Sequence, residues 1–421
     1  MKFKSFLIII FGGLCLMAKA QDMEILEVKI EGPEKTSISF IKKLLTLKSG
    51  MVLDSLIMEK DVTRLKRLPS ISHAFYQVHK ESDASCVVVY TIYENFTLIP
   101  FANLFSSSND DFAFRIGLQE FNLLGRNMTL GGFYQYDIFN SFGLSFRAPY
   151  LFSNKLGLAF SYNNFTTQEP VFLDNGEADY RYNNEGVEVL GLYEIDFKNR
   201  IAFGASLFTE DYNYLSGATD LNVPQELKVD KHLFKLIYDF EDINYHYQYL
   251  SGFRSSLNLQ YVGSSDINLP DFWIGFNDFA YFRRLGRRGN WASRLRLGLA
   301  SNIDTPFAPF TVDNNLNIRG VGNTIDRGTG AIVFNTEYRH TVVDKDWFVL
   351  QTNIFVDGGS WRNPGGDFSD FGDDQNIRIY PGAGLRFMHK RIFNAIFRID
   401  YGFGITKDGD RGIVFGIGQY F

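Results

Sequence analysis

The residues of this chain that could carry out chemistry form no recognisable catalytic or metal-binding pattern. The segment 313–317 begins like a calcium-binding loop, but Ile318 stands where such a loop needs glycine and Thr324 where it needs glutamate. His73 and His79 lie six residues apart on an expected strand, which is not the spacing of a zinc site. The sequence contains no H-E-x-x-H, G-x-S-x-G or P-loop motif. We therefore expect no enzyme, no catalytic residues, no metal site and no cofactor.

An acidic cluster between residues 367 and 374 is the remaining candidate for ion binding. Four aspartates occur there, close to the end of an expected loop. A solvated acidic loop explains them best, and a weak site for a divalent cation is the alternative. The aspartates are Asp367, Asp370, Asp373 and Asp374.

The composition of the chain excludes several classes of protein. Aromatic residues make up 16% of the 421 residues and charged residues 21%, so disorder is excluded. No segment after residue 20 has the roughly 18 consecutive apolar residues of a membrane-spanning helix. The net charge of -6 argues against binding to nucleic acid. Two cysteines give no disulfide framework.

The first twenty residues have the pattern of a secretory signal peptide. Two lysines precede an apolar run over 6–17, and an Ala-Lys-Ala cleavage site follows at 18–20. An N-terminal anchor helix is the alternative, although the run is short for one. Residues 1–20 are therefore expected to be removed on export.

Residues 21–94 are expected to form a small α/β domain. Period-two alternation predicts a strand over 24–31, and helical spacing predicts helices at 37–45 and after Asp54. Two further strands are expected at 71–80 and 85–94, which gives the order β-α-α-β-β.

From residue 95 to the end, long period-two stretches predict a transmembrane barrel. In residues 392–404, Phe397 and Tyr401 share one face and Arg398 and Asp400 the other. Stretches of this length match a tilted membrane-spanning strand, and their even number is what a single-chain outer-membrane barrel requires. The sixteen expected strands are 96–105, 111–120, 127–138, 140–148, 155–166, 184–195, 200–212, 231–241, 253–263, 271–284, 291–302, 331–342, 348–358, 377–388, 392–404 and 411–421.

The connections between these strands alternate in length. The long ones are 167–183, 213–230, 303–330 and 359–376, and all of them follow odd-numbered strands. Outer-membrane barrels have long loops outside and short turns in the periplasm. Because the first strand leaves the small domain, that domain is expected on the periplasmic, short-turn side.

Five short motifs follow one another along this part of the chain. Two are expected turns, at 120–126 and 148–151. Residues 317–321 read N-I-R-G-V, 355–359 read F-V-D-G-G, and 415–421 form a last strand with a final aromatic residue. In this order they resemble motifs of the BamA/TamA outer-membrane protein assembly superfamily (the bacterial surface antigen family). The counterparts are its first two periplasmic turns, the [VL]-R-G-[FY] signature of the sixth outer loop with Val321 in place of the aromatic, the F-x-D-x-G motif and the terminal targeting strand. The residues singled out are Asn122, Leu123 and Gly125; Ile318, Arg319 and Gly320; Asp357 and Gly359; and Phe415, Gly418 and Phe421.

The resemblance implies a POTRA domain over 21–94, a 16-stranded barrel over 95–421 and an outer-membrane location in a Gram-negative bacterium. It also implies that the loop carrying Arg319 folds into the lumen. By alternation Asp357 and Glu337 face inward, so Arg319 is expected to meet them as a planar fork that a carboxylate can accept twice. A solvated surface arginine is the alternative reading.

Function then follows as an expectation. The leading hypothesis is assembly or insertion of outer-membrane proteins, with clients received by the POTRA domain and a lateral seam between the first and last barrel strands. Pro100 and Gly412 weaken that seam. A polypeptide-secreting transporter of the two-partner type and a passive pore are the alternatives. The expected partners are the bilayer, unfolded outer-membrane or secreted polypeptides and accessory assembly proteins. A single POTRA domain favours a dedicated or accessory factor.

Overall fold

The computed structural model describes most of the chain after residue 22. The described residues are 23–106, 112–173, 175–246, 248–305, 308–313, 316–321, 326–390, 392, 395–407 and 409–421. The expected signal peptide at 1–20 lies outside them. None of the helices in these ranges is long and apolar enough to cross a membrane.

A small N-terminal module precedes the barrel. Its elements are β1 (Glu24–Glu31), α1 (Ile38–Leu44), α2 (Ser55–Lys66), β2 (Ile71–Ser82) and β3 (Ser85–Glu94). Ser37 and Asp54 accept hydrogen bonds from backbone N–H groups at the starts of the two helices, which fixes where each begins. The sheet has the order β1-β3-β2, with β1 parallel and β2 antiparallel to β3. One face of each helix packs on the sheet around Ile41, Leu65 and Tyr90.

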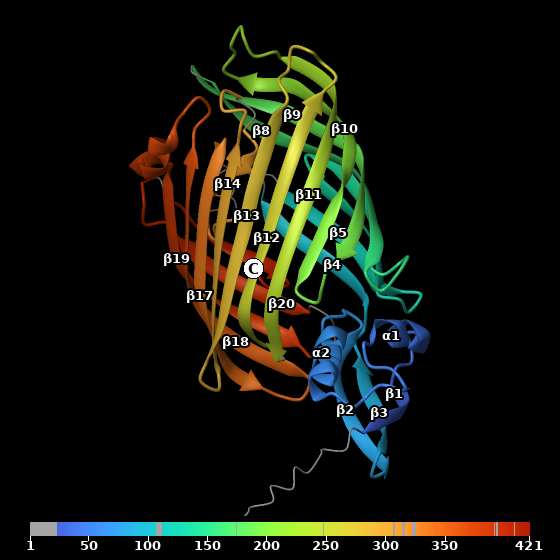
Figure 1. Ribbon diagram of the computed structural model, residues 1–421. Coiled ribbons are helices and arrows are strands. Elements are labelled where there is room, and N and C mark those ends of the chain that lie inside the picture. Colours follow the sequence, from blue (N-terminus) through green and yellow to red (C-terminus); the bar gives the residue numbers. More distant parts are fainter. Residues whose placement is uncertain are drawn as a thin grey trace, which may run out of the picture.

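The rest of the described chain forms one antiparallel sheet of sixteen strands that curls into a nearly closed barrel, which confirms the expected count (Figure 1). The strands are β4 (Leu98–Ser106), β5 (Phe112–Leu123), β6 (Met128–Asp137), β7 (Phe139–Ala148), β8 (Leu156–Leu173), β9 (Gly176–Glu194), β10 (Asn199–Gly217), β11 (Glu226–His246), β12 (Tyr249–Ser264), β13 (Phe272–Leu285), β14 (Gly289–Ala300), β17 (Gly330–Asp344), β18 (Phe348–Arg362), β19 (Ile377–His389), β20 (Ile396–Phe403) and β21 (Arg411–Ile417).

Short elements lie in the two longest connections. The segment between β14 and β17 contains the hairpin of β15 (Phe310–Thr311) and β16 (Arg327–Gly328). The segment between β18 and β19 contains two 3-10 turns, η1 (Phe368–Gly372) and η2 (Asp374–Asn376). The two longest connections, β14–β17 and β18–β19, both start and finish at the end of the barrel opposite the module (Figure 1).

The prediction of long loops at 167–183 and 213–230 is wrong. Most of 167–183 and 213–230 is strand, because β8 to β11 run far beyond their neighbours and project at the end opposite the module (Figure 1). The projecting part has its own aromatic packing: Tyr182 stacks on Tyr212 with ring centroids 4.7 Å apart, and Tyr180 meets Tyr214 edge-on at 5.7 Å. These cross-strand pairs stabilise paired strands in segments that were expected to be loops.

The barrel presents its apolar side chains outward. On β20, Phe397 is 53% exposed and Tyr401 44%, whereas Asp400 between them is fully buried on the lumenal side. On β18, Ile354 is 64% exposed and Asp357 is fully buried. The outer surface is therefore apolar and the interior polar, which is the reverse of a soluble sandwich.

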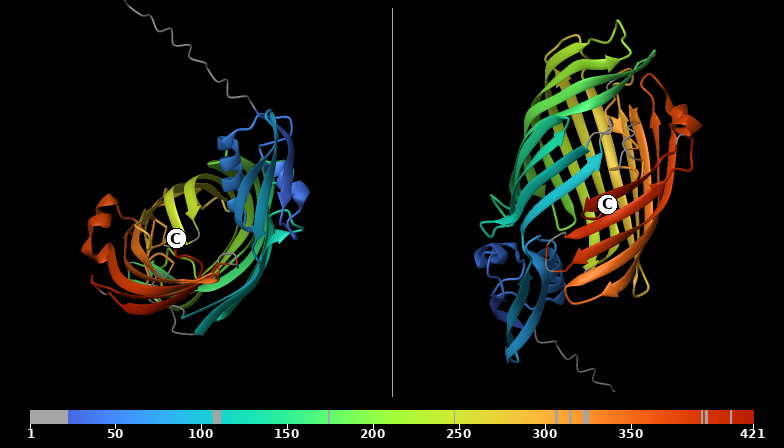
Figure 2. Two further views of the ribbon diagram at one scale, coloured as in Figure 1. Left: turned by 90° about the horizontal axis from the view of Figure 1, so that it is seen from below. Right: turned by 180° about the vertical axis from the view of Figure 1, so that it is seen from behind.

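The first and last barrel strands, β4 and β21, lie next to each other without forming a ladder. They are the two ends of the hydrogen-bonded strand order, and they face each other in the view from behind (Figure 2). Within the described residues, one isolated bridge joins the chain before the first strand of the sheet to the chain near its last strands. It pairs Phe96 with Ile392, outside the named strands. The wall therefore has a seam at this position.

Candidate functional site: a buried ion network in the lumen

The segment between β14 and β17 folds into the lumen, where it contacts the wall. Ile318 and Arg319 are completely buried. Gly320 has φ of +94°, and a Cβ there would lie 2.6 Å from the backbone of Gly402 on β20. On β18, a Cβ at Gly359 would lie 2.6 Å from Val312 of the same segment. The chain thus passes so close to the wall that glycine is needed on both sides.

Arg319 binds two carboxylates of the wall. Its Nε and Nη2 donate to the two oxygens of Asp357 over 2.8 and 2.9 Å, which is a bidentate pair. Its backbone N–H also donates to Asp357, over 3.0 Å, and its Nη1 donates to Glu337 over 2.6 Å. All three side chains are fully buried. The structure thus brings together the arginine and the two carboxylates expected from the sequence.

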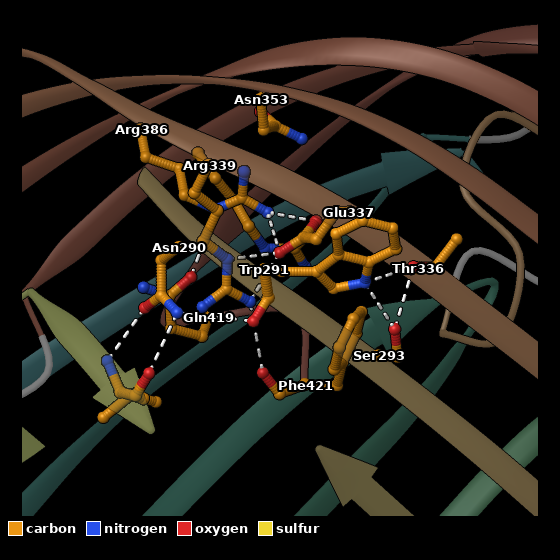
Figure 3. Close-up of polar contacts among 12 residues, drawn as sticks. Asn290, Trp291, Ser293, Thr336, Glu337, Arg339, Asn353, Arg386, Gln419 and Phe421 are labelled. Carbon is orange, nitrogen blue, oxygen red and sulfur yellow. Dashed lines mark hydrogen bonds and ion pairs between the residues drawn. The ribbon is translucent and has the colours of Figure 1, made fainter. Parts of the chain in front are cut away.

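Glu337 is shared by three arginines. Arg386 on β19 donates to both of its oxygens over 3.1 and 2.9 Å, and Arg339 on β17 forms a further ion pair (Figure 3). Asp400 on β20 is the third buried carboxylate, 3.7 Å from Arg319 and 3.2 Å from Arg398. The network therefore links the loop to β17, β18, β19 and β20. The alternation in the sequence placed Arg398 on the same face as Asp400, but it did not predict that Arg386 and Arg398 share these carboxylates.

Two aromatic rings cover the guanidinium of Arg319. Its central carbon lies 3.7 Å from the ring centre of Phe355 and 4.4 Å from that of Tyr420. Such contacts with an arginine are favourable, and more so where water is excluded. Tyr420 was missed, because the sequence pattern places it on a wall strand.

The terminal strand is shorter than expected. It was predicted over 411–421, but β21 ends at Ile417, and Gly418 has φ of +91°, which turns the chain inward. Phe415 remains on the outer surface, 62% exposed, whereas Phe421 is buried in the lumen. The left-handed conformation at Gly418 accounts locally for the change of direction.

The expected turn motif between β5 and β6 contacts the module. The side-chain amide of Asn122 donates to Thr36 over 3.0 Å, and its oxygen accepts from the backbone of Asn127 over 2.9 Å. Gly125 has φ of +67°, and its carbonyl accepts from the N–H of Ser37 over 2.9 Å. Leu123, half-buried, pairs with β6. The motif residues therefore hold the module against the barrel.

The module loop at this contact is organised by Glu94. Its carboxylate accepts from the backbone N–H groups of Glu34, Lys35 and Thr36 over 2.6 to 3.0 Å. Burial alone would raise the pKa of Glu94, but these hydrogen bonds outweigh it and lower the pKa below its usual value. The carboxylate therefore stays ionised and keeps the loop in the shape that meets the turn.

Two arginines of the module extend this contact to other turns. Arg64 on α2 pairs with Glu194 of β9, which also accepts from the hydroxyl of Tyr150 over 3.0 Å. Arg67 donates to the carbonyl of Glu241 over 3.1 Å and lies over the ring of Phe197 at 3.9 Å. Tyr150 belongs to the second expected turn motif, but nothing in the sequence singled out the two arginines.

No metal or cofactor site emerges in the described ranges. No group of three or more histidine, cysteine, aspartate or glutamate residues there could hold a metal ion. Asp367 and Asp373 in the acidic segment instead accept from backbone N–H groups at the starts of η1 and η2. Their carboxylates are used as local caps.

Comparison with known proteins identifies the fold. No family model and no curated protein matches the sequence. Among solved structures, BamA from Haemophilus ducreyi lacking POTRA domains 1–3 has a TM-score of 0.53 at 14% identity, covering 94% of this chain and 84% of that one. CdiB from Acinetobacter baumannii has a TM-score of 0.61 at 15% identity, covering 95% and 74%. CdiB from Escherichia coli has 0.63 at 12%, covering 94% and 76%. The chain has the fold that these proteins share, as the sequence resemblance implied.

Proposed function

We propose that this chain, with the fold shared by BamA and CdiB, is an outer-membrane barrel that assists the assembly or insertion of other outer-membrane proteins. The observation that carries the proposal is the seam. β4 and β21 lie next to each other but form no ladder within the described residues, so each strand presents an unpaired edge. An unpaired edge can template the strand of another chain.

The outer surface supports a place in a membrane. Large apolar side chains face outward on β20 and β18, as do Phe203 and Leu207 on β10, which are 60% and 62% exposed. A surface of this kind in water would aggregate, whereas a bilayer covers it. The expected bacterial outer membrane is the membrane in which barrels of this architecture occur.

We infer that residues 21–94 form a POTRA domain in the periplasm, which would follow export directed by a signal peptide at 1–20. The order β1-β3-β2 leaves β1 and β2 as sheet edges. Ile71 and His73 of β2 line a cavity of about 880 Å³ between the module and the barrel, together with Ile396 and Phe421. An extended client bound at this edge would be close to the module-side end of the barrel wall.

The ion network would keep the inner segment in place while the seam changes. Arg319 joins this segment to β17 and β18, and Asp400 extends the network to β20, the strand next to β21. The proposed division of labour is a network that holds β17 to β20 together and an edge between β4 and β21 that can open. No catalytic chemistry is assigned, since strand exchange requires only hydrogen bonding and burial.

Secretion of a polypeptide through the lumen is the second candidate. The likeness to CdiB favours it as much as the likeness to BamA favours assembly. A secreted chain would have to displace the segment around Arg319 from the lumen, together with its buried ion pairs. A passive pore is disfavoured for the same reason.

Reconstitution in proteoliposomes tests the proposal. We would cross-link the seam with one cysteine in Leu98–Ala102 and one in Ile413–Ile417, in a chain whose Cys86 is replaced by alanine. The oxidised protein should stop inserting a small unfolded barrel protein, and reduction should restore insertion. A matched cysteine pair joining β12 and β13 should have no effect. Equal insertion by oxidised and reduced seam variants would contradict the lateral route.

Depletion in cells distinguishes the two candidates. Loss of several barrels from the outer-membrane proteome indicates general assembly, and loss of one indicates a dedicated partner. A secretion role instead predicts an unchanged set of barrels and one polypeptide missing from the medium or the cell surface.

A further inference from the structure

Basic side chains from the module and from the barrel line the cavity between them (the basic cavity). The cavity has a volume of about 880 Å³ and lies where α2 and β2 approach the module-side end of the wall (Figure 1). Three of the chain's six histidines line it as well. Among the described residues of the lining, none is aspartate or glutamate. The lysines and arginines are Lys66, Arg67, Arg254 and Lys390, and the histidines are His73, His246 and His389.

The charge of this lining does not follow from the composition of the chain. The chain has 48 acidic and 42 basic residues and a net charge of -6, so a surface of ordinary composition would contain carboxylates. The positive groups also affect one another. Burial lowers the pKa of His73, and the charges of Lys66 and His246 lower it further. Like charges gathered in one cavity favour an anionic ligand.

Two of the four lysines and arginines lack a carboxylate partner. Arg67 and Lys390 each form an ion pair with a carboxylate outside the lining. Lys66 is half-buried at the end of α2, and Arg254 lies over the ring of Phe282 at 5.6 Å. Neither Lys66 nor Arg254 forms an ion pair with any described residue. One of these two cations comes from the module and the other from the barrel.

The rest of the lining is largely apolar and borders a strand edge. Ile243, Leu250 and Phe282 come from the barrel. Ile71 belongs to β2, which is an edge of the module sheet. Such an edge has backbone groups that another strand can bind. A strand alternates its side chains between two faces, so one extended segment can present acidic side chains to the cations and apolar side chains to this surface.

We propose that the basic cavity binds an acidic segment of another polypeptide in extended conformation, with carboxylates placed at Lys66 and Arg254. The inference rests on the proposed function in taking this segment to be part of a client, and it adds the chemical class of segment that the cavity selects. Positive charge at the mouth of the barrel also speeds the encounter with such a segment. An anionic lipid headgroup would use the same charges but not the edge of β2, so the geometry favours a polypeptide.

Peptide binding to the purified full chain in detergent tests this inference. The probe is a fluorescent peptide of about ten residues, the length of one barrel strand, in which valine and glutamate alternate. In the control peptide glutamine replaces every glutamate, which keeps the length and the pattern and removes the charge. The glutamate peptide should bind about tenfold more tightly or better, and its affinity should fall as the salt concentration rises. Equal affinities of the two peptides would overturn the proposal.

The variant Lys66→Gln with Arg254→Gln tests the position of the site. Neither residue has an ion pair to lose, so the thermal unfolding midpoint should stay unchanged while the glutamate peptide binds about tenfold more weakly. Lys60→Gln with Arg287→Gln is the matched control, because both residues are exposed, lie outside the cavity and remove the same charge. Equal weakening by the two double variants would show that only net charge matters and would contradict the site.

Photo-crosslinking maps the site on the unaltered chain, so the test remains decisive if a variant does not fold. The glutamate peptide with a photoreactive residue at its centre should label the chain within 66–73 and the facing strands of the barrel. Labelling confined to other parts of the module or to the outer surface would contradict the proposal. Displacement of the peptide by phosphatidylglycerol, but not by phosphatidylcholine, would assign the cavity to a lipid headgroup and would also overturn it.

Failure of this inference can be told apart from failure of the proposed function, because binding is measured without insertion. A chain that inserts barrel proteins but binds both peptides equally keeps the proposed function and loses the basic cavity as a site. A chain that binds the glutamate peptide at the cavity and inserts nothing keeps the site and loses the assembly function.

Discussion

At the scale of single residues, the lumen depends on pairing charges that cannot reach water. Arg319, Asp357 and Glu337 are fully buried and hydrogen-bonded to one another. Removing one member of a buried pair costs more than the pair contributes, because the partner stays buried and charged. Loss of Arg319 would affect Asp357 most, because Glu337 would still form ion pairs with Arg339 and Arg386.

Arg319→Ala should therefore lower the free energy of unfolding of the barrel by about 3 kcal/mol, and Asp357→Ala by a similar amount. The double mutant should be no worse than either single mutant, because both remove the same interaction. Equilibrium unfolding in detergent measures the cycle. Arg319→Lys should behave like the alanine variant, since lysine lacks the planar fork. Strictly additive losses would show that the two residues do not pair.

Gly320→Ala should displace the inner segment from the wall. At φ of +94° alanine is strained, and its Cβ would lie 2.6 Å from the backbone of Gly402. Gly365→Ala is the matched control, because φ is +73° there and no atom lies within 4 Å of the added carbon. We expect limited proteolysis to cut the Gly320 variant in the segment between β14 and β17, and the Gly365 variant to resist as the wild type does. Equal resistance of both would contradict the close approach.

At the scale of elements, three turns of the barrel hold the module. The β5–β6 turn contacts Thr36 and Ser37. Lys43 donates to the carbonyl of Tyr150 in the β7–β8 turn over 3.2 Å, and the two arginines of and after α2 bind at the β9–β10 turn. These contacts join parts of the chain that are far apart in sequence, so they fix the orientation of the module rather than its fold. The module core is made of its own residues.

Replacing both Arg64 and Arg67 by alanine should loosen the module without unfolding it. Hydrogen exchange should speed up in the segments that face the barrel, near residues 34–37 and 66–73, and stay slow in the core of β3. Arg126→Ala is the control, because Arg126 lies in the β5–β6 turn but is exposed. Unchanged exchange at 34–37 and 66–73 in the double variant would show that the arginines do not hold the module.

At the scale of the whole molecule, barrel and module have separate folding requirements. The barrel has a complete set of sixteen strands, and nearly all of its backbone bonds lie within that set. A barrel of this kind satisfies its backbone groups without water, which is why it withstands detergent. The module contributes contacts to three turns and the edges of its own sheet.

A chain without residues 21–94 should still fold into a barrel and lose its function in assembly. It should require detergent for extraction and migrate differently on gels before and after heating, as the full chain should. Complementation of a depleted strain measures the function. Full growth with the truncated chain would exclude a receptor role for the module, and a water-soluble product would contradict the membrane barrel.

The order of elements could be predicted from local pattern, because it depends on local chemistry. Alternation of apolar and polar residues marks a strand and its outward face whatever its partner is, so the sixteen strands and the inward direction of Glu337 and Asp357 were accessible. The pairing of Arg319 with those acids followed only with the family resemblance. Spacing alone does not say that a 28-residue segment folds inward.

The tertiary structure decided how far the strands extend beyond the segments predicted from alternation, and where the last strand ends. Residues 178–182 alternate as a strand does, but the sequence could not reveal the partners Tyr212 and Tyr214 that extend the sheet. Residues 418–421 also continue the spacing of a wall strand, but the chain turns inward at Gly418. The arginines that they contact there, such as Arg294 and Arg386, come from strands that are brought together only in the folded barrel. Period-two spacing records which side of a strand each residue takes, and it carries no information about contacts with distant strands.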